Sequence, residues 1–445
     1  MKSRSITGPV LLVVVGLLFL VNNMRPEVPL WSLVWDYWPV LLMLMGVIGL
    51  VEALYHASRG TPGPARPLAS GGVIWIVALI AFFSWANSTG HLHLGPFTNG
   101  GIHILGTEYD YDVSQTGSST GVTRVVLDNL HGTLSVKGED GGDVKVSGRK
   151  SIRAFSKTDA DRADQQSPIR VERQGDLLII RAQDPANSNM LSVSCDLDIT
   201  IPRGLDVEAS GRTGDLTIDD IAGNVNVTPG RGDVRLSNIG KDVRIEDTRG
   251  GLIRVTEVKG KLDLTGRGGD VQIENIQGQV TVHGEYLGTL EFHALAKQLH
   301  FTSEASDFRV EAVPGNITLD SGDLKMTDVT GPVRFKTGTR DIEAMDVTNG
   351  MEISIQRGDI EVTQTKTPLS KLDVHTHSGD VTLAIPENSE FDLDGKTGKG
   401  DVTNDFGEPL KTSEEGRAAT IQGKKGSGPE IKVGTDRGSL TIKKS

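Results

Sequence analysis

The fold is decided by a repeated strand pattern, which is clearest in "GDLTIDDIAGNVNVTPGRGDVRLSNI", residues 214–239. An apolar residue stands at Leu216 and again two and five positions later, and the same spacing starts anew at Val234. Apolar residues that alternate with a period of two are typical of a β-strand that buries one face. Copies of this pattern begin at Leu216, Val234, Ile253, Val271, Leu290, Phe308, Leu324, Ile342 and, in degenerate form, Ile360.

A second, shorter strand pattern lies nine residues after each of the first seven copies. It begins at Val225, Val243, Leu262, Val280, Leu299, Ile317 and Val333. Both series repeat every 18 or 19 residues, apart from one step of 16. A fixed period with two strands per repeat is the signature of a solenoid, in which each coil stacks on the one before. We therefore predict an all-β solenoid, or β-helix, in which each series forms one stacked column.

The tripeptide Arg-Gly-Asp occurs at 231–233 and 357–359, where it reads like an integrin-type adhesion signal. Gly-Asp also precedes other strands with a different residue before it, so we interpret the pair as a turn that the coils need. The arginine is then incidental, and adhesion through these tripeptides is not expected. The predicted turn positions are Gly214, Asp215, Gly232, Asp233, Gly269, Asp270, Gly322, Asp323, Gly358, Asp359, Gly379, Asp380, Gly400 and Asp401.

Three apolar segments with almost no charge precede the repeats, at 6–24, 37–55 and 71–86. Each is near the roughly 20 residues that a helix needs to cross a bilayer. Lys2 and Arg4 precede the first segment and Arg59 and Arg66 lie in the second loop, whereas the first loop has Arg25 together with the acids Glu27 and Asp36. The positive-inside rule then predicts a multi-pass protein of the inner or cytoplasmic membrane, with a cytoplasmic N-terminus and the β domain on the periplasmic or extracellular side.

These patterns divide the chain into five regions. We expect three transmembrane helices in 1–86, a juxtamembrane linker in 87–121, an N-terminal β region and cap in 122–210, β-helix repeats in 211–404, and C-terminal strands or a cap in 405–445. A short helix is expected to begin near Ser156. An open solenoid end would leave strand groups unpaired, so the flanking regions are interpreted as caps.

Composition restricts the chemistry of the chain. Its formal charge of -12 and its lack of a basic stripe argue against nucleic acid as a partner. The single cysteine, Cys195, cannot form an intrachain disulfide. The outward columns of the repeats are mixed in charge, so we assign no catalytic or cofactor-binding residue and expect a protein that is not an enzyme. A polysaccharide-active β-helix enzyme, which would need clustered carboxylates, stays as a remote alternative.

Two histidines are weak candidates for a metal site. In "KLDVHTHSGD" (371–380), His375 and His377 share the outer face of one strand. With a third ligand they could bind zinc, whereas two solvated imidazoles are the simpler interpretation. No cofactor is predicted.

Two regions of the chain each resemble a known family. "LDITIPRGLDVEASGRTGDLTIDDIAGNVNV" (197–227) and "GPEIKVGTDRGSLTIKK" (428–444) resemble the bacterial putative-adhesin family of β-strand repeats, also called toastrack domains. "GLLFLVNN" (16–23), followed by "WDYWPVLLMLMGVIGL" (35–50), resembles the transmembrane region of the LiaI/LiaF type. The resemblance implies a right-handed β-helical domain tied to the membrane, with a role in envelope-stress signalling or surface organisation. It supplies no established catalytic residues.

The expected function is a membrane-anchored, non-enzymatic, adhesin-like scaffold or binding module of the cell envelope. The alternative is an envelope-stress sensor or regulator that signals through membrane partners. The expected partners are the lipid bilayer and either a second copy of the chain or another envelope or membrane protein.

Overall fold

The computed structural model describes residues 106–182, 192–248 and 250–445. The three apolar segments and residues 87–105 lie outside this described part, and so do the predicted membrane crossings and their orientation. No helix within the described ranges is long and apolar enough to cross a membrane. The β domain is therefore described by itself.

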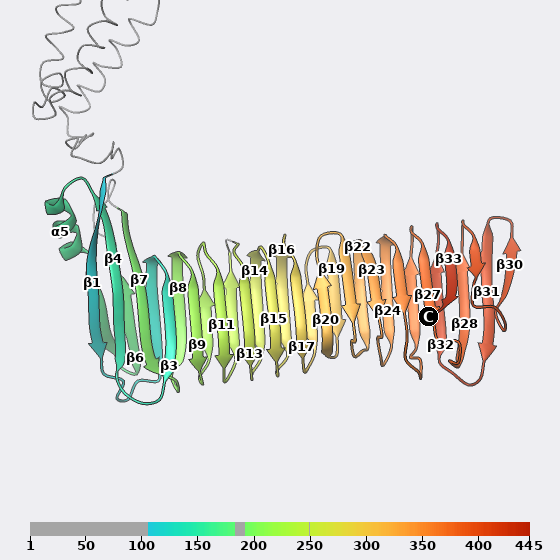
Figure 1. The fold of residues 1–445 in the computed structure, drawn as a ribbon, viewed down its shortest axis with the longest axis horizontal. Coiled ribbons are helices and arrows are strands. Elements are labelled where there is room, and N and C mark those ends of the chain that lie inside the picture. Colours follow the sequence, from blue (N-terminus) through green and yellow to red (C-terminus); the bar gives the residue numbers. More distant parts are fainter. Residues whose placement is uncertain (1–105, 183–191, 249) are drawn as a thin grey trace, which may run out of the picture. The chain divides into compact units, whose positions relative to one another are not determined.

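Two long β-sheets lie face to face in this domain and are built from stacked coils (Figure 1). The first, sheet A, has the order β1 (Thr107–Gly117), β4 (Val144–Ala154), β7 (Ser192–Pro202), β3 (Leu134–Glu139), β9 (Leu216–Ile221), β11 (Val234–Ile239), β13 (Ile253–Val258), β15 (Val271–Ile276), β17 (Leu290–Leu295), β20 (Val313–Leu319), β21 (Asp323–Thr327), β23 (Asp341–Met345), β25 (Ile360–Thr363), β27 (Val381–Ile385), β33 (Leu440–Lys444) and β29 (Val402–Asn404).

Sheet B contains the strands that return across the core. Its pairing order is β5 (Ile169–Gln174), β6 (Leu177–Ala182), β2 (Arg124–His131), β8 (Asp206–Thr213), β10 (Val225–Thr228), β12 (Val243–Asp247), β14 (Leu262–Gly268), β16 (Val280–Tyr286), β18 (Leu299–Thr302), β19 (Ser306–Val310), β22 (Val333–Thr339), β24 (Met351–Arg357), β26 (Leu372–Thr376), β32 (Glu430–Thr435), β28 (Phe391–Thr397), β31 (Ala418–Lys425) and β30 (Lys411–Glu415).

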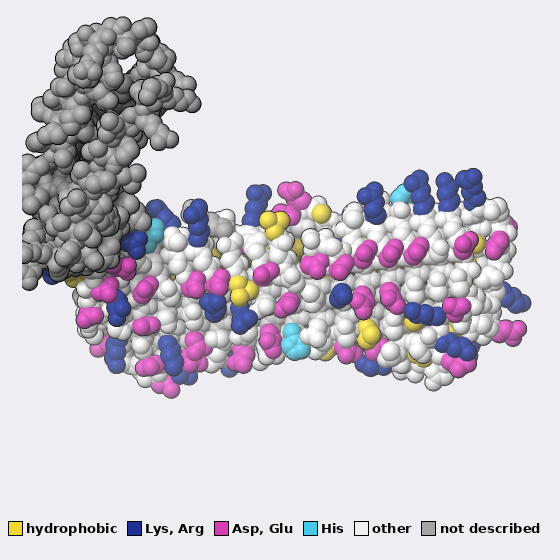
Figure 2. Space-filling view, turned by 45° about the horizontal axis from the view of Figure 1, so that its top comes forward, with side chains coloured by type: hydrophobic (Ala, Val, Ile, Leu, Met, Phe, Trp, Pro, Cys, Tyr) yellow, Lys and Arg dark blue, Asp and Glu magenta, His cyan; other side chains and the backbone are white. Residues whose placement is uncertain are grey.

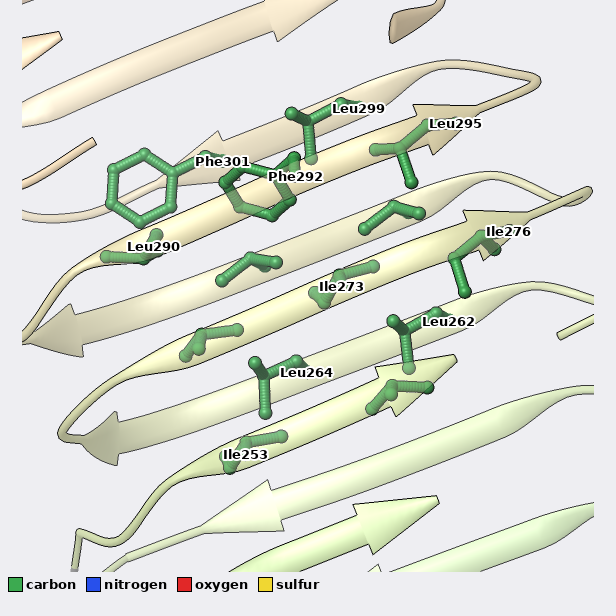
Figure 3. Packing of buried hydrophobic residues seen from close by; sticks show 14 of the residues in the cluster. Ile253, Leu262, Leu264, Ile273, Ile276, Leu290, Phe292, Leu295, Leu299 and Phe301 are labelled. Atoms are coloured by element: carbon green, nitrogen blue, oxygen red, sulfur yellow. The ribbon is translucent and has the colours of Figure 1, made fainter. Parts of the chain in front are cut away.

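The predicted all-β solenoid is confirmed by the pairing of equivalent residues in successive coils. Val234 pairs in parallel with Ile253, and Val225 pairs in parallel with Val243. The apolar residues of both sheets point into the space between them, as Ile273, Leu264 and Phe292 do in Figure 3. Each such side chain contributes roughly 1.5–3 kcal/mol by leaving water, so the repeated columns supply the core of the domain.

The six-residue strand pattern has a backbone cause. In a regular strand, the residue five positions after an inward one would face solvent. In the repeats, the fifth residue of the six takes a left-handed conformation, with φ of 60° at Asp220 and 52° at Asn238. This conformation turns the chain so that the following residue faces the core again, and Ile221 and Ile239 are buried as a result.

One coil of the stack runs in the opposite direction, which corrects the prediction for Phe308 and Ile317. Strand β19 pairs antiparallel with β18 and β22, and β20 pairs antiparallel with β17 and β21. Phe308 therefore lies in sheet B and Ile317 in sheet A, each in the column expected for the other. Tight turns at 303–306 and 320–323 close two hairpins, each within one sheet. In the regular coils the chain instead crosses from one sheet to the other at these places.

Both ends of the stack contain a coil from elsewhere in the chain. Strands β32 and β33, expected in a C-terminal cap, lie inside the stack, between β26 and β28 and between β27 and β29. At the other end, β2 and β3 lie between β6 and β8 and between β7 and β9. Each inserted strand gains neighbours on both edges, so fewer strand edges remain unpaired.

The N-terminal end of the domain begins earlier than expected. Residues 107–117, which we assigned to the linker, form β1 and pair antiparallel with β4. Helix α5 (Lys157–Gln166) is capped by the Ser156 side chain, which accepts a hydrogen bond from the Asp159 N–H at 3.2 Å. Ala160 and Ala163 of this helix are buried against the end of the core.

Candidate functional site

The Gly-Asp pairs join successive coils through their aspartate side chains. The Asp215 carboxylate accepts a hydrogen bond from the Asp233 N–H at 3.0 Å. Asp341, which follows Arg340 rather than a glycine, accepts a similar bond from the Asp359 N–H at 2.8 Å. Similar bonds run from the N–H groups of Leu252, Thr289, Asp380 and Ser439 to Asp233, Asp270, Asp359 and Asp380. Hydrogen bonds to an ionised carboxylate are stronger than neutral ones. These aspartates therefore hold coil to coil.

The glycines of these pairs have a backbone that other residues rarely adopt. Gly232 has φ of 143° and Gly379 has φ of 148°. A Cβ atom would lie 2.2 Å from the Gly214 carbonyl oxygen in the first case and 2.0 Å from the Gly358 oxygen in the second. Positive φ also occurs at Gly214, Gly358 and Gly400. The turn thus needs glycine both for its conformation and for the close approach of the next coil.

The pair Gly322-Asp323 forms a different kind of turn. It belongs to the hairpin between β20 and β21, where the Asp320 carboxylate accepts hydrogen bonds from the N–H groups of Gly322 and Asp323 at 2.8 and 2.7 Å. These bonds, first of all the one from Asp323, hold the pKa of Asp320 below its ordinary value. Gly269 has no positive φ, although Asp270 still bonds to the next coil.

Both Arg-Gly-Asp tripeptides lie in the stacked turn from sheet B to sheet A. The Arg231 N–H donates to the Arg212 carbonyl at 2.8 Å, and the Arg357 carbonyl accepts from the Arg340 N–H at 2.9 Å. The side chains of Arg231 and Arg357 are exposed. The backbone of each tripeptide is thus held by the coils on either side of it, rather than presented on a free loop.

An open groove of about 450 Å³ crosses the start of β21, β23, β25 and β27 on sheet A. Its charged lining residues are Asp323, Lys325, Asp341, Glu343, Asp359, Glu361 and Asp380. Two of its carboxylates have ion-pair partners: Glu343 lies 3.4 Å from Lys325, and Glu361 lies 3.2 Å from Lys443. The lining is polar and acidic, and Asp341, Asp359 and Asp380 already serve as contacts between coils.

The two candidate histidines share a carboxylate that the sequence reasoning missed. His377 Nδ1 lies 2.7 Å from Asp436 Oδ2, and His375 Nε2 lies 3.5 Å from Asp436 Oδ1. The hydrogen bond to His377 lowers the pKa of Asp436. Asp436 reaches the histidines because β32 inserts beside β26, and a separation of 59 residues gave no local signal for this contact. The residues described here contain no group of three or more His, Cys, Asp or Glu side chains that could hold a metal ion.

Several acids of the domain have a pKa that their surroundings lower. A general acid needs a pKa raised toward the working pH. Among the described residues, each carboxyl group with a resolved change has its pKa lowered instead: Asp161, Asp176, Asp320, Asp346, Glu387, Glu430 and Asp436. These groups are suited to ion pairs and hydrogen bonds.

Two family models match the chain. Residues 278–443 match the model described as Toastrack DUF4097, and residues 7–105 match the LiaF transmembrane domain. No protein with a curated description matches the sequence.

The chain also matches solved structures at low sequence identity and low TM-score. A putative cell adhesion protein from Clostridium sporogenes is 9% identical, with a TM-score of 0.18, over 76% of this chain and 100% of that one. A putative lipid binding protein from Parabacteroides distasonis is 11% identical, with a TM-score of 0.30, over 63% and 97%. A putative adhesin from the same organism is 11% identical, with a TM-score of 0.24, over 76% and 97%.

Proposed function

Since the chain carries a toastrack domain after a LiaF-type transmembrane domain, we propose that it is a membrane-anchored protein of the cell envelope whose β domain binds or scaffolds other envelope components without catalysis. In this proposal the N-terminus is cytoplasmic, and the β domain lies on the periplasmic or extracellular side. The positive-inside distribution of Lys2, Arg4, Arg59 and Arg66 supports this orientation.

The observation that carries the proposal is the polar outer surface of a rigid, stacked core. Among the described residues, Leu287 and Met345 are the large hydrophobic side chains that are exposed. Figure 2 shows many Lys, Arg, Asp and Glu side chains over one face, with a few hydrophobic side chains scattered among them. Such a surface suits recognition through ion pairs and hydrogen bonds rather than through a hydrophobic pocket.

A regulatory role is the second candidate. The match of residues 7–105 to the LiaF transmembrane domain favours it, because that domain gives the β domain a route to other membrane proteins. In this version, occupation of the β domain changes which membrane proteins the helices contact.

One experiment tests the proposal and separates its two versions. A tag is placed after Ser445, the chain is crosslinked in native membranes, and the recovered partners are identified. The matched control is a tagged chain limited to residues 1–105, which should lose every partner of the β domain. Recovery of envelope polymer or of the chain itself would support a scaffold, and recovery of a membrane signalling protein would support a regulator. The side of the membrane that carries the tag is checked by protease accessibility in the same cells. A tag that is cut from the cytoplasmic side, or the same partners in the control chain, would overturn the proposal.

A further inference from the structure

The turns from sheet B to sheet A form a charged ridge along the last coils of the domain. Its cationic row is Arg357, Arg437 and Lys399, with Ser378 between the first two. Backbone hydrogen bonds link these positions: the N–H of Gly358 donates to Ser378, that of Gly379 to Arg437, and that of Gly438 to Lys399, at 3.0, 2.9 and 3.0 Å. Arg437 and Lys399 therefore lie one coil spacing of about 4.8 Å apart, and Arg357 lies two coils from Arg437.

The acidic row of the charged ridge lies two residues further along each turn. It consists of Asp359, Asp380 and Asp401, with Ser439 between the last two. All three carboxylates are exposed. Figure 2 shows the general pattern: Lys and Arg side chains run along one border of the C-terminal half, with a row of Asp and Glu beside them.

The cations of the charged ridge have no ion-pair partner within the described part of the domain. None of Arg357, Arg437 and Lys399 pairs with a carboxylate among the described residues. On the flat sheets some outward cations are paired within the described ranges, as Lys325 is with Glu343, and others, such as Lys336, are not. The unpaired row is held by stacked backbone, so it is a fixed array that a partner could meet.

We propose that the charged ridge binds the same ridge of a second copy of this chain, side by side and in parallel. A two-fold axis along the ridge exchanges its two rows, so the cationic row of one copy faces the acidic row of the other. Arg357 then meets Asp359 of the second copy, and Lys399 meets Asp401, with both pairs repeated by symmetry. A two-fold axis across the ridge would instead face cations with cations.

A polyanion is the competing occupant, and the charge pattern disfavours it. Two strand residues span only about 6–7 Å, so the acidic row lies within the Debye length of roughly 8 Å from the cations. A chain of phosphates on the cationic row would meet the acidic row at the same time. The formal charge of -12 adds to this repulsion. A ridge with one cationic and one acidic row is complementary in charge to a second such ridge, and less so to a polyanion.

The parallel arrangement also agrees with the proposed anchoring. It brings the N-terminal ends of two β domains to the same end of the pair, as two copies that enter one membrane through residues 7–105 require. Exposed ion pairs are individually weak, so the pair is not expected to persist as a dilute solution dimer. Attachment to one membrane raises the effective concentration of the second copy and favours the contact.

The test uses the full-length chain in phosphatidylcholine vesicles. Single cysteines are introduced as Ser378→Cys, in the ridge, and Thr403→Cys, near its end, and each protein is treated with a short bismaleimide. Both should give crosslinked dimers, because a parallel pair brings each position close to its own copy. The native chain is the control, since Cys195 is buried. An antiparallel pair would crosslink at no more than one of the two positions and would overturn the proposal.

Charge changes then test the pairing itself. Arg357→Glu with Lys399→Glu should reduce crosslinking by about tenfold, and so should raised salt. Asp401→Lys suits a rescue, because the Asp401 side chain makes no hydrogen bond to the next coil. A mixture of Lys399→Glu chains and Asp401→Lys chains should recover mixed dimers. Crosslinking that ignores these changes would contradict the proposal. Polyphosphate is added as a second probe. If the Glu variant loses polyphosphate binding while its dimers persist, the proposal is also contradicted.

This inference rests on the proposed binding role, and the two can fail separately. If the β domain binds a different envelope component, the Arg357→Glu and Lys399→Glu chain would still recover that component in the tagged pull-down while the native chain gives no dimer. If the binding role is wrong, no β-domain partner would appear in either experiment.

Discussion

The Asp341 carboxylate accepts a hydrogen bond from the backbone N–H of Asp359 at 2.8 Å, across the boundary between two coils. Asp341 follows Arg340, and the same bond recurs where Gly-Asp closes other coils, so an aspartate at this turn position supplies the link to the next turn. The repeat of this pair along the chain is therefore explained by stacking.

The link between coils predicts a measurable loss of stability. Asp341→Ala removes the acceptor for the Asp359 N–H and should lower the free energy of unfolding by about 1 kcal/mol. Asp401→Ala is the matched control, because the Asp401 side chain makes no such bond among the described residues. Thermal unfolding followed by circular dichroism would compare them. Equal midpoints for the two variants would contradict the structural role of Asp341.

The glycine of the turn should tolerate no side chain. Gly379→Ala places a Cβ 2.0 Å from the Gly358 carbonyl oxygen, at φ of 148°, so the coils must separate locally. We expect a loss of about 3 kcal/mol or more in the free energy of unfolding. Gly338→Ala is the control, since a Cβ there meets no atom within 4 Å and the change should stay within about 0.5 kcal/mol. Denaturant unfolding of both variants measures the difference.

A buried aspartate predicts how stability depends on pH. Burial opposes ionisation of Asp346, but hydrogen bonds from the Thr365 N–H and hydroxyl, at 2.7 and 2.8 Å, together with the nearby Lys366 ammonium lower its pKa. A carboxyl with a lowered folded pKa stabilises the fold above its unfolded pKa, and this contribution is lost as the pH falls through the folded value. Asp346→Asn should therefore flatten the fall of the unfolding midpoint between about pH 5 and pH 3. An unchanged slope would show that Asp346 does not contribute.

Much of the fold could be predicted from the sequence because the core repeats. Inward residues such as Val234 and Ile253 occupy equivalent positions of successive coils, so the period and the parallel pairing were visible from their spacing. The left-handed conformation of Asp220 left one sign in the sequence, which is that two polar residues instead of one precede the apolar Ile221. The reversed coil was hidden, since Phe308 fits the strand pattern whichever sheet it joins, and the step of 16 was its one sign.

The candidate sites were harder to predict, because they depend on contacts between distant coils. His375 and His377 could be placed on one face from their spacing, but the contact with Asp436 requires the insertion of β32 beside β26. The charged ridge likewise brings Lys399 next to Arg437 through β33, which lies between β27 and β29. A local pattern gives no information about such an insertion.

The end of the domain near β1 yields the last prediction. Lys150 is buried, lies 2.5 Å from the Asp164 carboxylate, and donates hydrogen bonds to the Asp164 and Ser167 carbonyls at 3.0 and 2.8 Å. These carbonyls belong to the C-terminal end of α5, where helices leave acceptors without partners. Lys150→Met should leave the buried acceptors unsatisfied and destabilise the domain by about 2 kcal/mol.

The effect of Lys150→Met should be strongest in the helix itself. Amide hydrogen exchange should accelerate in residues 157–166 more than in the central coils, because α5 is held to the core partly through Lys150. Lys157→Met is the control on the exposed side of the helix, where the pair with Asp161 is solvated and its loss should matter little. Exchange in α5 that is equally fast in both variants would mean that Ala160 and Ala163, rather than Lys150, hold the helix in place.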